Sequence, residues 1–132
     1  HSGLDADRES ATERLVRAVE HPAVDVLGHP TGRLINSRPG MNPDVGRVAE
    51  AAAANDVAVE VNANPARLDA NGSFVRHVVE AGGLVAVNTD AHRPGELDNA
   101  RYGVHTARRG WATVEDVVNA RDYDGLRAFL DG

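Results

Sequence analysis

Cysteine is absent from all 132 residues of the chain. Its absence excludes disulfide bonds, thiolate nucleophiles and cysteine-based zinc sites, and it fits a reducing, cytoplasmic location. Lysine is absent too, so all 14 basic residues are arginine, and the net charge of −6 gives no overall basic surface for nucleic acid. No apolar run approaches the ~18 residues that a membrane-spanning helix needs, so we expect no membrane partner.

Aromatic residues are also scarce, at 4% of the chain, whereas apolar residues make up 42%. The core must therefore be built mainly from valine, alanine and leucine. At 14.0 kDa the chain is long enough for one domain or for a portion of one.

The apolar pattern alternates between helical and extended segments. It predicts helices over 8–20, 44–54, 72–81, 97–109 and 123–130, and strands over 24–27, 57–64 and 84–87. Asp44 is suited to capping the second helix, and Gly82-Gly83 to ending the third. This order of elements is typical of an α/β fold, a parallel sheet with right-handed crossovers.

Three strands are too few to close a barrel, and the first predicted element is a helix with no strand before it. The chain also lacks an initiator methionine. We therefore expect residues 1–132 to be the C-terminal portion of a larger α/β barrel, with about three parallel strands and flanking helices present. The edge left by the missing strands should make the chain prone to self-association.

Asn88-Thr89-Asp90-Ala91-His92 follows the last predicted strand. Residues i and i+2 of an extended backbone share one side, so Asp90 and His92 form a pair suited to a divalent metal. An isolated D-x-H is more often a loop aspartate beside a solvated histidine, so the pair needs support from elsewhere in the chain.

That support comes from the other strand ends. His29 follows the first predicted strand and Asn62 and Asn64 follow the second, while His1 would follow a strand preceding the first helix. In an α/β barrel, side chains beyond the carboxyl ends of the strands meet at one rim. A mixed set of nitrogen and carboxylate ligands suits Mn²⁺, Zn²⁺ or Fe²⁺ better than Mg²⁺ or Ca²⁺.

Several charged residues allow more than one interpretation. Arg33 and Arg93 each lie a few residues past a candidate ligand and are suited to phosphate oxygens. Glu60 is expected to be an interior group paired with an arginine. Arg108 and Arg109, beside Gly110-Trp111, are suited to nucleic acid, although a helix C-terminus also favours cations.

Four segments together resemble the PHP (polymerase and histidinol phosphatase) domain, and most closely the C-terminal PHP domain of prokaryotic family X DNA polymerases. The segments are 28–34 (GHPTGRL), 62–69 (NANPARLD), 88–92 (NTDAH) and 101–111 (RYGVHTARRGW), and His1-Ser2-Gly3 is similar to a further family segment. The resemblance implies a distorted seven-stranded TIM-like barrel with up to three metal ions, Mn²⁺ being favoured and Zn²⁺ or Fe²⁺ being alternatives. It implies metal-dependent 3′–5′ exonuclease and phosphoesterase activity on DNA ends, beside an upstream polymerase domain.

Carried over by motif, the metal ligands are His1, His29, Asp90 and His92. Arg33, Asn64 and Arg93 are candidate contacts for substrate phosphate. The family's first metal-binding motifs belong to strands upstream of this chain, so the chain alone is expected to bind fewer metal ions, weakly, and to be inactive.

Two alternatives remain at this point. One is a stand-alone PHP phosphatase acting on small phosphomonoesters. The other is a non-catalytic PHP domain that only supports the polymerase, against which the four retained ligand positions count.

Overall fold

The structure, a computed structural model, describes residues 7–132. Three parallel strands form one sheet in the order β1-β2-β3, which confirms the α/β prediction. The elements run α1 (Arg8–Glu20), β1 (Val26–Leu27), α2 (Val45–Ala54), β2 (Ala58–Asn62), α3 (Gly72–Glu80), β3 (Val85–Asn88), the 3₁₀ helix η1 (Pro94–Asn99), α4 (Ala100–Arg109), the 3₁₀ helices η2 (Val114–Asp116) and η3 (Val118–Ala120), and α5 (Tyr123–Asp131).

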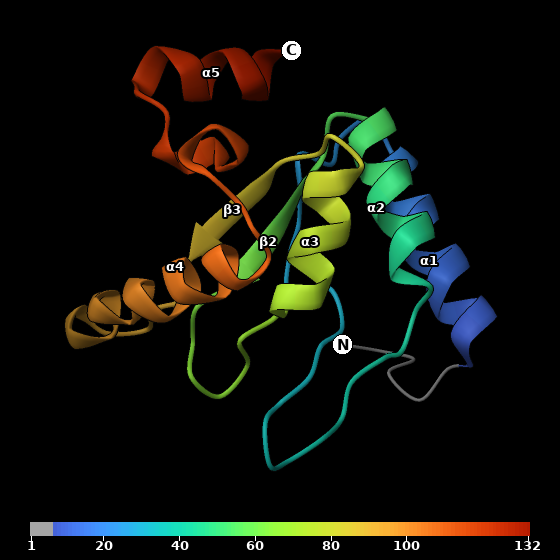
Figure 1. The fold of residues 1–132 in the computed structure, drawn as a ribbon, viewed down its shortest axis with the longest axis horizontal. Helices are drawn as coiled ribbons and strands as arrows, with labels where there is room; N and C mark the ends of the chain where they lie inside the picture. Colours follow the sequence, from blue (N-terminus) through green and yellow to red (C-terminus); the bar gives the residue numbers. More distant parts are fainter. Residues whose placement is uncertain (1–6) are drawn as a thin grey trace.

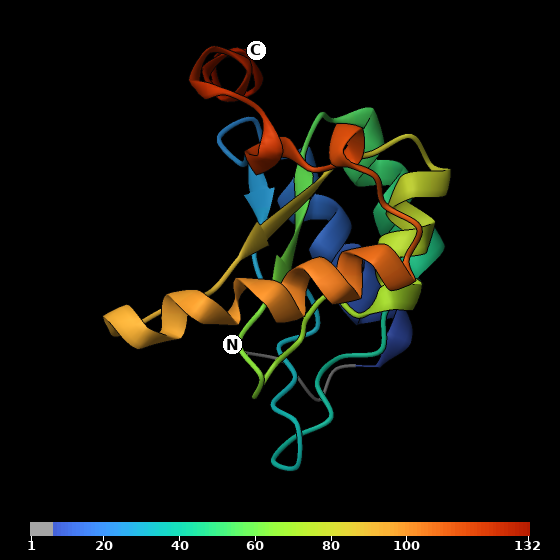
Figure 2. The same ribbon diagram turned by 60° about the vertical axis from the view of Figure 1, so that its left-hand side comes forward.

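Helices cover the sheet unequally. α1, α2 and α3 lie side by side against one face (Figure 1). α4 crosses the carboxyl ends of β2 and β3, whereas α5 lies at the opposite end of the strands (Figure 2). No helix among residues 7–132 has both the length and the apolar character needed to cross a membrane.

The helix boundaries follow the capping residues. Asp44 accepts a hydrogen bond from the Arg47 N–H at 3.3 Å, as predicted. α1 is capped by Asp7, whose carboxylate accepts from Ser10 N at 2.8 Å. Gly82, at φ +77°, ends α3 in the left-handed conformation that glycine allows.

Two strands are shorter than predicted. The first strand was predicted over 24–27 but begins at Val26. Val26 pairs with Ala58, the first residue of β2, so the residues before Val26 have no strand beside them. β2 ends at Asn62 because the backbone of Asn62 then pairs with Asp69 in the following loop, with N···O distances of 2.6 and 3.2 Å.

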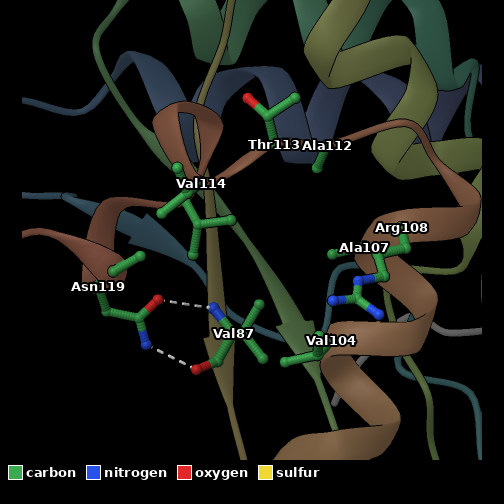
Figure 3. Close-up of a pocket in the computed structure, with 10 residues that line it drawn as sticks. Val87, Val104, Ala107, Arg108, Ala112, Thr113, Val114 and Asn119 are labelled. Carbon is green, nitrogen blue, oxygen red and sulfur yellow. Dashed lines mark hydrogen bonds between the residues drawn. The ribbon is translucent and has the colours of Figure 1, made fainter.

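The outer edge of β3 is covered by the chain's own C-terminal segment. The Asn119 side chain accepts from Val87 N at 3.0 Å and donates to Val87 O at 2.6 Å, copying a strand partner (Figure 3). Val117 forms a parallel bridge with Val85. Among the described residues, no backbone pairs with the outer edge of β1.

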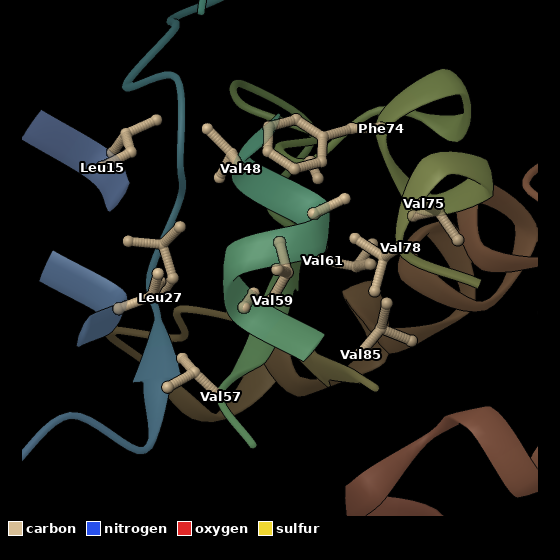
Figure 4. Close-up of a cluster of buried hydrophobic side chains, with 14 residues drawn as sticks. Leu15, Leu27, Val48, Val57, Val59, Val61, Phe74, Val75, Val78 and Val85 are labelled. Atoms are coloured by element: carbon tan, nitrogen blue, oxygen red, sulfur yellow. The ribbon is translucent and has the colours of Figure 1, made fainter. Parts of the chain in front are cut away.

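The main core lies between the sheet and α1–α3 and is built largely from valine (Figure 4), as the composition predicts. Val59, Val61 and Val85 from the strands meet Val48 and Phe74 from the helices there. A smaller cluster on the other face joins Ala58 and Ala86 to Val118, with Leu126 and Phe129 of α5 against it.

Gly103 permits the close approach of α4 to the strands. A Cβ atom on Gly103 would lie 2.6 Å from Val87 Cγ1 and 2.9 Å from Ala63 Cβ. Gly103→Ala is therefore expected to lower the free energy of unfolding by about 1–3 kcal/mol through overpacking, measured by urea denaturation. Gly95→Ala is the matched control because nothing lies within 4 Å of the added atom. Equal stability of the two variants would contradict this packing.

Candidate active site

Polar groups from the ends of all three strands converge at the carboxyl end of the sheet. Glu60 lies at their centre: one carboxylate oxygen accepts from His29 N at 2.7 Å and the other from Asn88 Nδ2 at 3.0 Å. Glu60 thus connects the residues that follow β1 with the end of β3. The prediction that Glu60 pairs with an arginine is wrong. The parallel strands bring an amide side chain and a backbone N–H to its carboxylate instead.

The Asp90 carboxylate accepts a hydrogen bond from an amide and forms an ion pair with a guanidinium. Asn62 Nδ2 lies 3.3 Å from Asp90 Oδ2, and Arg67 Nε lies 3.7 Å from the same oxygen. Asn62 is 1% exposed, and its Oδ1 accepts from Asn64 N at 3.1 Å, so its amide orientation is fixed from both ends. The orientation of the Asp90 carboxylate therefore depends on two residues that the sequence analysis did not assign to this role.

His92 is oriented by Asp90 and by Glu96. Its Nδ1 lies 2.7 Å from Asp90 O. A carbonyl oxygen only accepts, so Nδ1 donates here and Nε2 is the nitrogen left to face a metal ion, the arrangement usual for a metal-binding histidine. The His92 N–H donates to Glu96 Oε2 at 2.6 Å, and this bond is the main cause that lowers the pKa of Glu96.

Two candidate ligands lie on unusual backbone. His29 has φ +23° and Asp90 has φ +53°, in the region that non-glycine residues seldom adopt. Such conformations persist where the surroundings fix them, and they recur at functional sites. The hydrogen bonds to Glu60 and Asn62 are part of that fixation here.

Asp69 holds the loop that carries His29. Its carboxylate accepts from Thr31 N at 3.1 Å and from Gly32 N at 2.8 Å, and the residue is 1% exposed. Burial raises the pKa of the Asp69 carboxyl, and the bonds from Thr31 and Gly32 partly offset that rise. Asp69 lies within a segment that carries the family resemblance, yet its sequence context alone does not reveal this contact.

The candidate phosphate contacts differ in their surroundings. Arg33 donates through Nε to Arg67 O at 2.7 Å and through its terminal nitrogen to Leu68 O, so its guanidinium ties two loops together. Asn64 Oδ1 accepts from Ala66 N at 3.0 Å within its own turn. Arg93 is exposed and pairs with Glu96 at 3.1 Å. Their contacts with phosphate stay predictions.

The fit to a metal ion is partial. Among residues 7–132, no three His, Cys, Asp or Glu side chains form a group that could hold a metal ion. His1, the fourth predicted ligand, lies outside the described residues. The donor chemistry nevertheless suits a divalent ion, because Asp90 supplies a carboxylate and His92 an imidazole that binds Asp90 O through Nδ1. The metal site stays a prediction.

No family model matches the chain. It is 39% identical over 130 residues to the DNA polymerase/3'-5' exonuclease PolX of Bacillus subtilis (strain 168), which is 98% of this chain and 23% of PolX. It is 30% identical over 128 residues to a "Probable phosphatase" of Shewanella piezotolerans, covering 92% of this chain and 49% of the relative. A "Probable phosphatase" of Shewanella loihica is 34% identical over 114 residues, covering 82% of this chain and 44% of that relative.

The chain thus spans about a quarter of the length of PolX and about half the length of these phosphatases. The identity to PolX over nearly the whole chain confirms the resemblance to the PHP domain of family X DNA polymerases.

Proposed function

Because nearly the whole chain is related to a part of PolX, we propose that it is part of a metal-dependent phosphoesterase domain that removes nucleotides from DNA 3′ ends. The observation that carries this proposal is the convergence of Glu60, Asn62, Asn88 and Asp90 at the carboxyl ends of parallel strands. Active sites of α/β barrels collect at this end, and relatives named as an exonuclease and as phosphatases share the need to hydrolyse a phosphate ester.

The metal-binding residues would be His29, Asp90 and His92, joined by His1. A divalent ion bound there, for which Mn²⁺ is favoured over Zn²⁺ or Fe²⁺, would supply Lewis acidity and an activated water for attack on phosphorus. Up to three such ions are expected in the intact domain and fewer in this chain.

The remaining residues of the site have separate roles. Asn62 and Arg67 orient the Asp90 carboxylate, and Glu96 fixes the backbone of His92. Arg93, whose ion pair with Glu96 is exposed, would exchange that pair for a phosphate oxygen. Their common effect is to present the ligands in one fixed arrangement before substrate arrives.

The larger setting is part of the proposal. We expect the three-stranded sheet to be one portion, residues 1–132, of a distorted seven-stranded barrel of the PHP type. Its partners would be a polymerase domain in the same polypeptide and DNA 3′ ends, which implies a cytoplasmic location. The parallel strand order and the identity to PolX support this arrangement.

A second candidate function is hydrolysis of small phosphomonoesters. It is supported by the relatives from Shewanella piezotolerans and Shewanella loihica, each named a "Probable phosphatase". An exposed Arg93 would serve a free phosphate group as well as a DNA end, so the site residues alone do not separate the two substrates.

The test compares both substrates with the full-length protein that carries this chain. With Mn²⁺ present, we expect 5′-labelled single-stranded DNA to be shortened stepwise from its 3′ end, and EDTA to stop the reaction. p-Nitrophenyl phosphate is the parallel substrate for a small phosphomonoesterase. Cleavage of that compound with DNA left intact would favour the second function, and inertness toward both would overturn the proposal.

A further inference from the structure

The only tryptophan of the chain, Trp111, is 63% exposed. It follows Gly110, the C-cap residue of α4, and adopts φ +66°. The preceding Gly110 packs tightly against α3, since a Cβ atom there would lie 2.5 Å from Val75. This contact fixes the turn at the end of α4. The Trp111 ring is therefore held on the surface and does not contribute to a core that contains few aromatic residues.

Arg76 of α3 stacks on the Trp111 ring. Its guanidinium carbon lies 3.8 Å from the ring centroid, and its Nε is 2.9 Å from Glu80 Oε1. The cation–π contact and the ion pair together orient the ring. Because the residue remains 63% exposed with this contact made, it is still accessible to a further stacking partner.

A cationic groove runs along α4, whose last two residues, Arg108 and Arg109, line it and precede Trp111 closely in the chain. It encloses about 610 Å³ and is lined by Leu68, Tyr102, His105, Thr106, Arg108 and Arg109. None of these lining residues, all within the described part of the chain, is acidic. A chain of net charge −6 thus concentrates arginine, histidine and aromatic side chains at one place, which is the composition of single-strand binding grooves.

The groove also leads toward the candidate active site. Leu68 lines it, and the neighbouring Arg67 lies 3.7 Å from Asp90. α4 itself crosses the carboxyl ends of the strands (Figure 2). A polymer lying along α4 would therefore reach Asp90 with one end while its more distant units contact Trp111.

We infer that Trp111 and the α4 groove bind single-stranded nucleic acid, with an unpaired base stacked on the indole and phosphates on Arg108 and Arg109. This inference rests on the proposed function and adds to it a separate binding site for the strand upstream of the cleaved end. A protein partner is the competing occupant, since tryptophan beside arginine also marks protein interfaces. The cationic lining favours the polyanion.

Trp111 provides its own probe, because all tryptophan fluorescence of the chain comes from this residue. We expect a 12-nucleotide oligothymidylate, added in EDTA at low salt, to quench that fluorescence through base stacking. An abasic oligonucleotide of equal length should bind weakly and leave the fluorescence nearly unchanged. Equal quenching by both, or quenching by neither, would overturn the inference, and the second result would leave a protein partner as the occupant.

Variants separate stacking from charge. By anisotropy of a labelled oligonucleotide, Trp111→Ala is expected to lower affinity about tenfold, as loss of one stacked base does, while Trp111→Phe keeps most of it. Arg108→Ala should reduce the slope of log affinity against log salt by about 0.7. Tyr123→Ala is the control, because Tyr123 is an exposed aromatic residue of α5, at the other end of the strands. Wild-type binding by Trp111→Ala would contradict the site.

The two proposals fail in different ways. If the full-length protein degrades DNA with Mn²⁺ while Trp111→Ala binds the strand normally, the stacking site is wrong and the proposed function stands. If Trp111→Ala loses binding but no DNA is hydrolysed, the binding site stands and the exonuclease proposal is wrong.

Discussion

Asp90→Asn is expected to reduce Mn²⁺-dependent DNA hydrolysis by the full-length protein at least about a hundredfold. Removing a residue that only supports a ligand typically costs 10–100-fold in metal affinity or activity, and Asp90 is predicted to be a ligand itself. Asparagine tolerates the left-handed backbone at φ +53° and keeps an oxygen for the bond from Asn62. The fold should therefore survive while the negative charge is lost.

The measurement is the rate of 3′-end shortening as a function of Mn²⁺ concentration. Asp98→Asn is the matched control, because this exposed carboxylate lies on η1 in the same stretch of chain. Thermal melting of both variants would check the fold. A normal rate in Asp90→Asn would remove Asp90 from the metal site.

Asp69→Ala is expected to lower the free energy of unfolding by about 2–4 kcal/mol. The substitution leaves the N–H groups of Thr31 and Gly32 without their acceptor, and a buried donor without a partner costs about 1–3 kcal/mol. Relief of the buried charge offsets part of this loss. Urea denaturation measures the total, and amide hydrogen exchange at Thr31 and Gly32 should accelerate more than exchange in β2.

The control for this variant is Asp98→Ala, since replacing an exposed surface carboxylate usually changes stability by no more than about 0.5 kcal/mol. Unaltered exchange at Thr31 and Gly32 in Asp69→Ala would mean that the His29 loop is held by other contacts.

The same residue gives a pH dependence of defined sign. Burial raises the pKa of Asp69 above 3.8, so the folded state binds this proton more tightly than the unfolded state. Its contribution to stability is therefore greatest below pH 3.8 and falls as the pH rises through the folded pKa. As the pH rises through that window, the free energy of unfolding of the wild type should fall relative to that of Asp69→Asn, and at higher pH the difference between them should stay constant. A difference that grows with pH would show that the two N–H bonds outweigh burial.

Local patterns in the sequence predicted most of the fold. The alternation of Val57, Val59 and Val61 marked β2, and Asp44 marked the start of α2. These signals work because burial and capping act within a few residues. The sequence pattern did not predict η1. The start of the predicted helix 97–109 is instead a 3₁₀ helix that begins at Pro94.

The contacts within the site were harder to predict. The partners of Glu60 depend on the register of two neighbouring strands, which pairs Glu60 with Ala86 and so brings Asn88, two residues further along β3, within reach of its carboxylate. Asp69 reaches Thr31 only because two loops fold toward each other across 38 positions of the chain. Alternation and spacing assign residues to faces and strand ends, but they do not specify which donor meets which acceptor.

A sheet with one covered edge can add a neighbour on one side only. Val117 and Asn119 occupy the edge of β3, so within residues 7–132 free strand backbone remains on β1 alone. Two copies joined through β1 would use up both free edges, and assembly would stop at a two-fold pair, whereas a sheet open at both edges can extend into a fibre. Self-association of this chain should therefore produce a particle of twice its mass in sedimentation velocity.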